Sequence, residues 1–416
     1  MQIKVGTMTT ENELESEIAK YDLWYAFSYI GNESIKANGN EQSDPMINLW
    51  TLSRVAHFFV KYGSFLGKIK IDNNSLSRIN NLIINLYEPF VQDNNLWSFF
   101  NRMQREQFPS QYGYGEQLAR YYWVFTKTKA LKKINEELVK QNKFDLQTYY
   151  KIFFYVLGNR IKMKSSHFEY QSLLNYCSQW QSKYDFLEIQ KIESFFCFIS
   201  NDLKNLKKEG MKLNNGLDSK YLKYEMSPLD IYPVINQFLG TKRCFIPSFE
   251  SLQIKMSTGL YYYFQNLYNL GSKNNDFLTR MGEAFEEYIG WLLKKYFGDQ
   301  NVKKVSEKIE TKNDEHADWV LFLDDEIFIF ECKARLLSLR GRQTYDNNTI
   351  KSFIEATVVK GCNQLKSTEE QLKTKCSNKK ITKIFVVLDD FNFQNDCFEG
   401  LLENIGVEKT TVDDVI

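Results

Sequence analysis

The residues best suited to chemistry lie at the two ends of one short segment, 316–334, with the sequence HADWVLFLDDEIFIFECKA. Two apolar runs flank the Asp-Asp pair at 324–325, which is typical of two antiparallel strands joined by a tight turn. The register set by that turn places Asp318 opposite Glu331. Side chains alternate along a strand, so Lys333 returns to the face of Glu331. Two carboxylates and an ammonium beside apolar strands are costly to bury, and they predict a bound cation.

These residue types suit the hydrolysis of a phosphodiester bond. This reaction requires neutralisation of charge on phosphorus and hydroxide near neutral pH, and one or two Mg²⁺ ions held by carboxylates supply both. A lysine beside such an ion is repelled by it and partly desolvated, and both effects favour a role as a base. A rigid hairpin holds this geometry better than loops do.

The helix that precedes the hairpin must position a third carboxylate. Asn275 or Asp276 can cap a helix that runs to about Phe297, and Gly298 can end it. Its apolar stripe carries Phe285, so the neighbouring Glu286 can lie at the edge of the buried face, with Glu283 one turn earlier as an alternative.

The other elements of this half complete an α/β pattern. We expect a strand near 302–309, a long helix near 349–373, a buried strand of parallel type at 381–388 (ITKIFVVL) and a short helix near 396–404. The order helix, three strands, helix, strand and helix predicts one domain over 276–416.

The first half of the chain has a helical apolar pattern. It predicts helices near 12–30, 46–67, 75–105, 115–140, 145–162, 167–183 and 186–206. Five tryptophans fall here, Trp24, Trp50, Trp97, Trp123 and Trp180, and an aromatic core is favoured over a surface that stacks bases. We expect a helical domain over 1–225 with a sensing, specificity or oligomerisation role, and a connecting hairpin and helix over 226–275.

Composition narrows the class of protein. The 416 residues carry a formal net charge of +1, so nucleic-acid affinity must come from local patches. The seven cysteines form no Cys-x-x-Cys pair and the three histidines supply no zinc spacing, which favours reduced cysteines. The N-terminal residues show no apolar signal segment, and no stretch suits a membrane span. We expect a cytoplasmic protein without membrane contact.

Asp318, Glu331-Cys332-Lys333 and the upstream Glu286, in this order of elements, resemble the PD-(D/E)XK nuclease superfamily, most closely its Mrr-like and RecB-like branches. The resemblance covers about 276–390, and Ala317 stands where the family's name-giving proline would be. It implies a C-terminal α/β/α restriction-endonuclease-like domain with a central mixed sheet. The expected fold class is therefore α+β and multidomain, with an all-α N-terminal domain.

The resemblance also implies roles for single residues. Asp318 and Glu331 would be ligands of Mg²⁺, or of Mn²⁺ in its place, together with the carbonyl of Cys332. Lys333 would orient or deprotonate the attacking water, and Glu286 would reach a metal directly or through water. Gln364, and Lys360 one turn before it, stand where related nucleases carry a supporting side chain.

A local excess of basic residues favours a polyanionic partner. Between Ala334 and Lys383 there are eleven basic residues against four acidic ones. Arg335, Arg340 and Arg342 fall in or beside LLSLRGRQTYDNN, which we expect to be a loop after the catalytic lysine. There, with Lys360, they would bind phosphates next to the scissile bond.

The predicted function is a Mg²⁺-dependent endonuclease acting on DNA, leaving 5′-phosphate and 3′-hydroxyl ends as the resemblance implies. Cleavage of both strands predicts a homodimer or a higher homo-oligomer. A bacterial role in antiviral defence or restriction, with partner proteins encoded nearby, rests on analogy of fold alone. Two alternatives remain open: a nucleic-acid-binding or assembly module without catalysis, and a nuclease acting on RNA or single strands.

Overall fold

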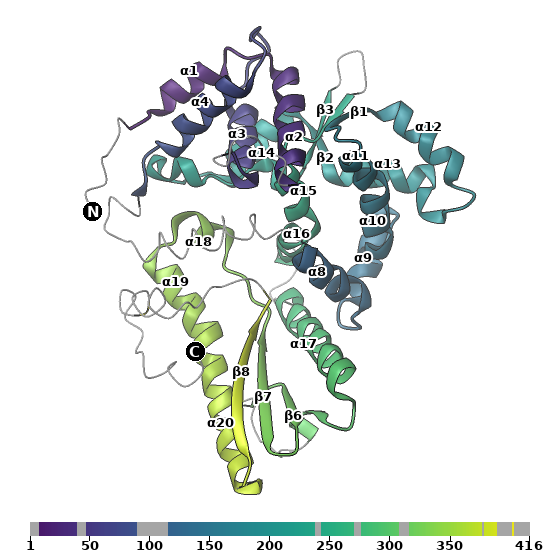
Figure 1. Cartoon of the computed structure of the whole chain (residues 1–416), viewed down its shortest axis with the longest axis vertical. Helices are drawn as coiled ribbons and strands as arrows, with labels where there is room; N and C mark the ends of the chain where they lie inside the picture. Colours follow the sequence, from purple (N-terminus) through teal and green to yellow (C-terminus); the bar gives the residue numbers. More distant parts are fainter. Residues whose placement is uncertain are drawn as a thin grey trace. The chain divides into compact units, whose positions relative to one another are not determined.

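The computed structural model describes residues 8–39, 47–89, 115–237, 243–269, 276–307, 316–376, 378–388 and Leu402. These residues form a mostly helical α+β protein with two four-stranded sheets (Figure 1), as the α+β prediction required. The chain divides into two compact units. The first comprises Met1–Asn94, Glu106–Tyr122 and Lys133–Phe264, and the second comprises Asn95–Arg105, Trp123–Lys132 and Gln265–Ile416.

Helices make up most of the first unit. Side-chain caps start many of them: Asp22, for example, accepts a hydrogen bond from Tyr25 N, so the single helix predicted near 12–30 is two helices. In chain order the helices of the first half are α1 (Glu11–Ile18), α2 (Leu23–Asn38), α3 (Leu49–Tyr62), α4 (Asn73–Ile84), α8 (Gly115–Lys127), α9 (Lys132–Asn142), α10 (Leu146–Ile152), α11 (Gly158–Lys162), α12 (Tyr170–Trp180), α13 (Ile189–Ile199), α14 (Leu203–Leu213), α15 (Phe249–Met256) and α16 (Thr258–Asn269).

The prediction of an all-α N-terminal domain was wrong, because the first unit contains a sheet. Its strands are β1 (His167–Glu169), β2 (Ser200–Asp202), β3 (Val234–Gln237) and β4 (Arg243–Phe245), in the order β1-β4-β3-β2. The predicted hairpin of β3 and β4 is antiparallel, and β2 runs parallel to β3. With three residues each, β1 and β2 are too short to show a period of two, and pairing with a distant hairpin decides their structure.

The described part of the second unit contains the predicted order of elements up to its last strand. It consists of α17 (Asp276–Phe297), β5 (Val302–Lys304), β6 (Trp319–Phe322), β7 (Glu326–Lys333), α18 (Leu339–Thr344), α19 (Asn347–Ile354), a π-helical turn at Glu355–Val359, α20 (Lys360–Lys375) and β8 (Lys380–Val387). Gly298 ends α17 in the left-handed region, with φ of 83°. The sheet order is β5-β6-β7-β8, and only the pair of β7 and β8 is parallel.

Some predicted features lie outside the described residues. They include residues 308–309 of the strand predicted near 302–309, residues 90–105 of the helix predicted near 75–105, the helix near 396–404 apart from Leu402, and Trp97. Within the described residues the strand prediction was wrong after Lys304, because Val305–Glu307 form a 3-10 turn. In the part of the chain that the structure describes, no helix combines the length and the apolar content needed to cross a membrane.

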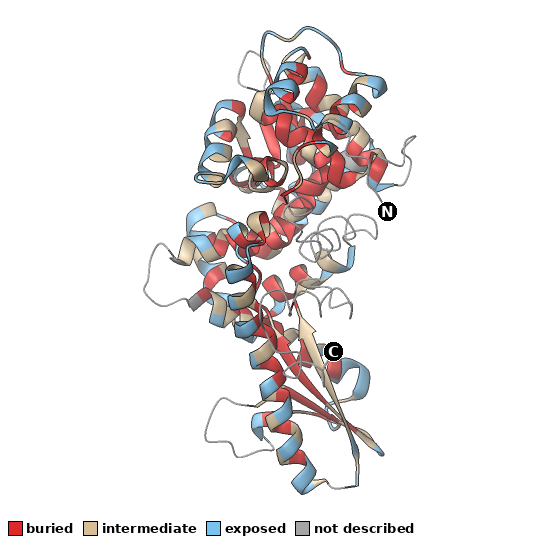
Figure 2. Cartoon of the chain, turned by 90° about the vertical axis from the view of Figure 1, so that its left-hand side faces the viewer, coloured by how far each residue is buried: buried red, intermediate tan, exposed pale blue. Residues whose placement is uncertain are grey.

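Helices cover both faces of the sheet in the second unit (Figures 1 and 2). On one face Val320 and Ile329 are fully buried and pack with Leu365 of α20. On the other face Trp319 lies against α17, where its indole Nε1 donates to the carbonyl of Glu286 at 3.1 Å. The apolar strands are therefore buried on both sides, which explains their nearly continuous apolar sequence.

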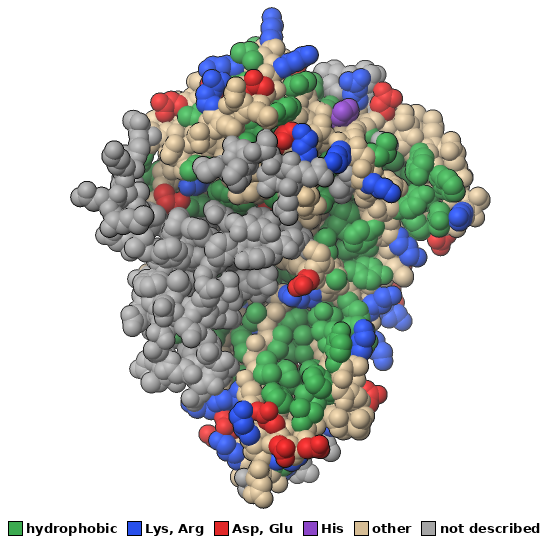
Figure 3. All heavy atoms as spheres, in the orientation of Figure 1, with side chains coloured by type: hydrophobic (Ala, Val, Ile, Leu, Met, Phe, Trp, Pro, Cys, Tyr) green, Lys and Arg blue, Asp and Glu red, His purple; other side chains and the backbone are tan. Residues whose placement is uncertain are grey.

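The tryptophans of the first half lie mainly in packed surroundings. Trp50 is buried, Trp24 stacks on Phe245 with ring centroids 5.3 Å apart, and Trp123 packs 4.9 Å from Trp291. Trp180 is 39% exposed and belongs to α12, beside which hydrophobic side chains reach the surface at the right of Figure 3. An aromatic core thus accounts for most of them.

Candidate active site

The hairpin of β6 and β7 has the predicted register. Trp319 pairs with Phe330, and Phe322 pairs with Ile327 beside the turn. At the end of the hairpin away from the turn, the backbone N–H of Asp318 donates to the carbonyl of Phe330 at 3.0 Å. Oδ2 of Asp318 accepts a hydrogen bond from the backbone N–H of Cys332 at 2.7 Å. The prediction that the Asp-Asp turn brings Asp318 to the end of β7 is confirmed.

Glu331, Lys333 and Gln364 form one hydrogen-bonded group at that end of the hairpin. Glu331 is buried with only 1% of its surface exposed, and its Oε1 accepts from Lys333 Nζ. Lys333 Nζ also donates to Oε1 of Gln364 at 2.7 Å. Nε2 of Gln364 in turn donates to the carbonyl of His316 at 3.1 Å, which ties α20 to the strand entering the site.

The two carboxylates lie where burial disfavours their charge. Burial raises the pKa of Asp318 to about 6, and the nearby charge of Glu286 adds to this effect. Burial also raises the pKa of Glu331 to about 8, with the charge of Asp318 as a further cause. The site therefore favours a proton or a cation beside these carboxylates.

A metal ion fits this donor set. Oε2 of Glu331 is buried without a hydrogen-bond partner among the described residues. A negative charge on this oxygen is therefore not stabilised by any hydrogen-bond donor of the described residues. Hard carboxylate oxygens are the ligands that Mg²⁺ prefers. Burial raises the pKa of the Cys332 thiol well above its usual value, so a carbonyl contribution from this residue suits the site better than a thiolate.

The described residues contain no group of three or more His, Cys, Asp and Glu side chains placed to hold a metal ion. An ion bound by Asp318 and Glu331 would complete its shell with backbone, water or phosphate oxygens, as Mg²⁺ commonly does. The expected third carboxylate, Glu286, pairs instead with Lys304 of β5 at 2.6 Å. Burial lowers the pKa of Lys304, but its contact with Glu286 outweighs burial and the net pKa is raised.

The residues expected to bind nucleic acid differ in how far they are exposed. Arg335 and Arg340 are exposed, Arg342 is half-buried, and Lys360 is exposed on α20 although Gln364, one turn later, faces Lys333. The prediction of a loop was wrong for residues 339–344, which form α18.

Capping explains why α18 forms. Oγ of Ser338 accepts from Gly341 N at 3.0 Å and thereby starts the helix, and Tyr345 ends it in the left-handed region. Burial of Leu337 and Gln343 anchors the short helix. Arg340 and Arg342 therefore lie on a helix and not on a loop.

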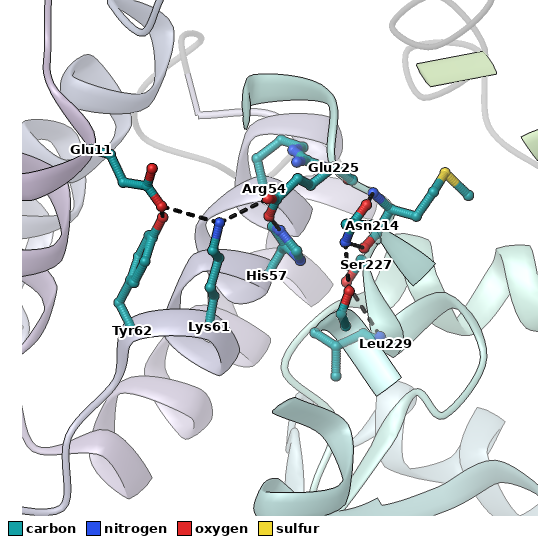
Figure 4. A network of polar contacts seen from close by, with 11 residues as sticks. Glu11, Arg54, His57, Lys61, Tyr62, Asn214, Glu225, Ser227 and Leu229 are labelled. Carbon is teal, nitrogen blue, oxygen red and sulfur yellow. Dashed lines mark hydrogen bonds and ion pairs between the residues drawn. The ribbon is translucent and has the colours of Figure 1, made fainter. Parts of the chain in front are cut away.

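Sequence reasoning missed a partly buried polar network around His57 in the first unit (Figure 4). The carboxylate of Glu225 forms an ion pair with Lys61 Nζ at 2.8 Å and accepts a hydrogen bond from His57 Nε2 at 3.2 Å. Arg54 donates to the carbonyl of Glu225 at 2.8 Å, and Lys61 also pairs with Glu11 at 3.3 Å. The only sequence signal was the i, i+4 spacing of His57 and Lys61 on α3, since Glu225 lies 168 positions from His57.

Glu287 of α17 is a second residue that sequence reasoning missed. Its carboxylate accepts from the backbone N–H groups of Lys129 and Ala130 at 2.8 and 3.3 Å. Lys129, Ala130 and Glu287 all belong to the second unit, so Glu287 holds the turn that follows α8 against α17.

The candidate active site thus consists of Asp318, Glu331, Lys333 and Gln364, with Glu286 close enough to affect its electrostatics. Comparisons of the chain with protein-family models, with curated proteins and with solved structures find no match.

Proposed function

We propose that this chain is a metal-dependent endonuclease of the PD-(D/E)XK type that hydrolyses phosphodiester bonds in DNA. The observation that carries the proposal is the buried, unpartnered Oε2 of Glu331 beside Asp318, with Lys333 hydrogen-bonded to the other Glu331 oxygen. The unit around it supports an α/β/α restriction-endonuclease-like fold, because α17 and α20 cover opposite faces of a mixed sheet.

In this proposal Asp318 and Glu331 hold Mg²⁺, or Mn²⁺ in its place, as ligands. The bound ion would neutralise charge on the scissile phosphate and lower the pKa of a water molecule. Lys333 Nζ uses two of its three N–H bonds on Glu331 and Gln364. The third can orient the attacking water or a phosphate oxygen, and Gln364 keeps the ammonium in position for this.

The basic residues extend the proposal to the substrate. Arg335 and Arg340 are exposed shortly after Lys333 in the chain and suit contacts with phosphates next to the scissile bond. Cleavage of both strands with one site per chain calls for a homodimer. The first unit would then control or direct cleavage, and restriction or antiviral defence in the cytoplasm is the biological role that we propose.

Cleavage of supercoiled plasmid tests the enzyme, with single-stranded DNA and RNA in parallel reactions. We expect cutting in Mg²⁺ that chelator abolishes and that Lys333→Ala reduces by at least about a hundredfold, the scale of a lost acid–base group. Lys380→Ala is the matched control, because Lys380 is an exposed lysine that pairs with Glu326 at the far end of β7. Equal cutting by wild type and Lys333→Ala contradicts the proposal.

A nucleic-acid-binding module without catalysis is the second candidate. The ion pair of Glu286 with Lys304 favours it, since this pair takes the third carboxylate away from a metal. Binding of DNA without any binding of Mn²⁺ would support this alternative. Cutting of RNA or of single-stranded DNA alone would instead support metal-dependent phosphodiester hydrolysis with a substrate other than duplex DNA.

A further inference from the structure

A cavity of about 450 Å³ lies in the first unit, at one end of its small sheet. Its walls come from β2, β3 and β4 and from α12, α13 and α14, which Figure 1 shows gathered around the sheet. The volume suits a small organic molecule. The cavity is also placed as ligand sites in α/β proteins often are, since parallel strand β2 ends there and α14 begins.

Several polar groups of the wall already satisfy one another. Asn236 Nδ2 donates to Ser200 Oγ at 2.8 Å, and its Oδ1 accepts from Cys244 Sγ at 3.2 Å. Both carboxylate oxygens of Asp202 accept from Asn205, one from its backbone N–H and one from its side chain, at 2.8 and 2.7 Å. These groups stabilise the cavity and leave little capacity for a ligand.

Three other lining groups have hydrogen-bonding capacity to spare among the described residues. They are the guanidinium of Arg243, the hydroxyl of Tyr170 and Nδ2 of Asn201, whose Oδ1 accepts from Asp202 N at 3.0 Å. Arg243 faces Glu169 across the β1–β4 pair, yet the two form no ion pair within the described part of the chain. The amide nitrogen and the guanidinium can only donate, and burial raises the pKa of Tyr170, which keeps its hydroxyl protonated.

The wall beside these donors is aromatic. Tyr170 and Phe196 meet edge to face, with ring centroids 5.4 Å apart. An aromatic wall and lining donors that include one guanidinium complement a flat heteroaromatic ring with acceptor atoms that carries an oxyanion.

We propose that this cavity binds a small heteroaromatic molecule bearing one phosphate or carboxylate, with Arg243 on the oxyanion and Tyr170 and Asn201 on acceptor atoms. The site belongs to the first unit and does not depend on the nuclease activity proposed above. Phosphate and carboxylate present the same acceptor oxygens to a guanidinium, so the experiment separates them.

Isothermal titration calorimetry tests the site, with the common ribonucleoside 5′-monophosphates as phosphate probes and nicotinate as the carboxylate probe. EDTA in every titration removes divalent ions from the second unit. We expect at least one probe to bind, and Arg243→Ala to weaken that binding about tenfold or more, the scale of a lost charge-assisted hydrogen bond. Binding of nucleotides alone identifies phosphate, and binding of nicotinate alone identifies carboxylate.

Two nearly isosteric variants keep the test meaningful if Arg243→Ala is poorly folded. Tyr170→Phe removes only the hydroxyl, and Asn201→Asp removes the donor while keeping the oxygen that accepts from Asp202 N; each should weaken binding severalfold. Lys208→Ala, at an exposed position of α14 outside the cavity wall, is the charge control and should bind like wild type. The proposal is overturned if no probe binds, or if Tyr170→Phe and Arg243→Ala both bind like wild type.

Discussion

Gly361 of α20 lies against Glu331 of β7, so closely that a Cβ at Gly361 would stand 3.3 Å from Glu331 Cγ. The same Cβ would stand 2.3 Å from Cε2 of Phe385. The missing side chain lets α20 approach the sheet, and this approach brings Gln364 to Lys333 at 2.7 Å. Packing of one helix and geometry of the candidate site are therefore linked through one glycine.

Gly361→Ala should lower both stability and activity. The added methyl group has to displace the Phe385 ring, and overpacking of this kind costs about 1–3 kcal/mol. It should also move α20 away from Lys333 and slow cleavage. Urea unfolding gives the change in the free energy of unfolding, and plasmid cleavage gives the change in rate.

Gly282→Ala in α17 is the matched control. A Cβ there meets nothing within 4 Å, so the substitution should raise the free energy of unfolding by about 0.5–1 kcal/mol through helix propensity. If Gly361→Ala stabilised the protein as Gly282→Ala is expected to, the close packing described here would be refuted.

Gln364→Ala should slow DNA cleavage about tenfold to a hundredfold, as loss of a side chain that orients a catalytic group typically does. The variant leaves Lys333 Nζ with Glu331 alone, and it removes the hydrogen bond to the carbonyl of His316. Initial rates on plasmid at saturating Mg²⁺ measure the effect. Gln371→Ala, two turns further along α20, should retain the wild-type rate, and an equal loss in both variants would point to general damage of the helix.

Mn²⁺ should stabilise the folded chain through Asp318. At a hundredfold excess of free ion over Kd, binding to the folded state alone adds about 2.7 kcal/mol. Melting temperatures with and without Mn²⁺ should show this increase for wild type and none for Asp318→Asn. The variant should stay folded, because it replaces a carboxylate whose charge burial disfavours.

Glu326→Gln is the control for nonspecific ion binding. Glu326 lies at the opposite end of β7, where it accepts from Thr382 and pairs with Lys380, both at 2.8 Å. This variant should keep the full response to Mn²⁺. A response that persists in Asp318→Asn would rule out Asp318 as a ligand.

His57 should make stability depend on pH. Burial lowers its pKa to about 4 in the folded protein, against an ordinary value of 6.5. The unfolded chain therefore takes up a proton between these values that the folded chain does not. Stability from this group is fully present above pH 6.5 and is lost as pH falls toward 4, by about 3 kcal/mol in all.

Urea unfolding between pH 4 and pH 7.5 measures this dependence. Glu225 should remain ionised throughout, since the hydrogen bonds of His57 and Lys61 outweigh burial and bring its pKa to about 2. His57→Gln should flatten the dependence, while His167→Gln, at an exposed position of β1, should leave it in place. An unchanged slope in His57→Gln would exclude His57 as its source.

The sequence alone was sufficient for the hairpin, for the helix α17 before it and for the strand β8 that pairs with it. The position of the Asp-Asp turn between two apolar runs determines which residues face each other, so the neighbourhood of Asp318, Glu331 and Lys333 followed from local pattern. The largely apolar segment at 381–388 likewise predicted a parallel strand, which is β8, although the residues of β8 are half-buried or exposed and not buried as predicted. In each case the information lies within a few residues of the chain.

Tertiary structure decided what depends on distant segments. The pairing of Glu286 with Lys304, the sheet that joins β1 and β2 to a later hairpin, and the bond between His57 and Glu225 all join residues whose local patterns carry no trace of the partner. Gln364 was a candidate from its place on the helix, but its contact with Lys333 depends on how closely α20 packs at Gly361. Packing fixes such contacts because close approach depends on side chains from several elements at once.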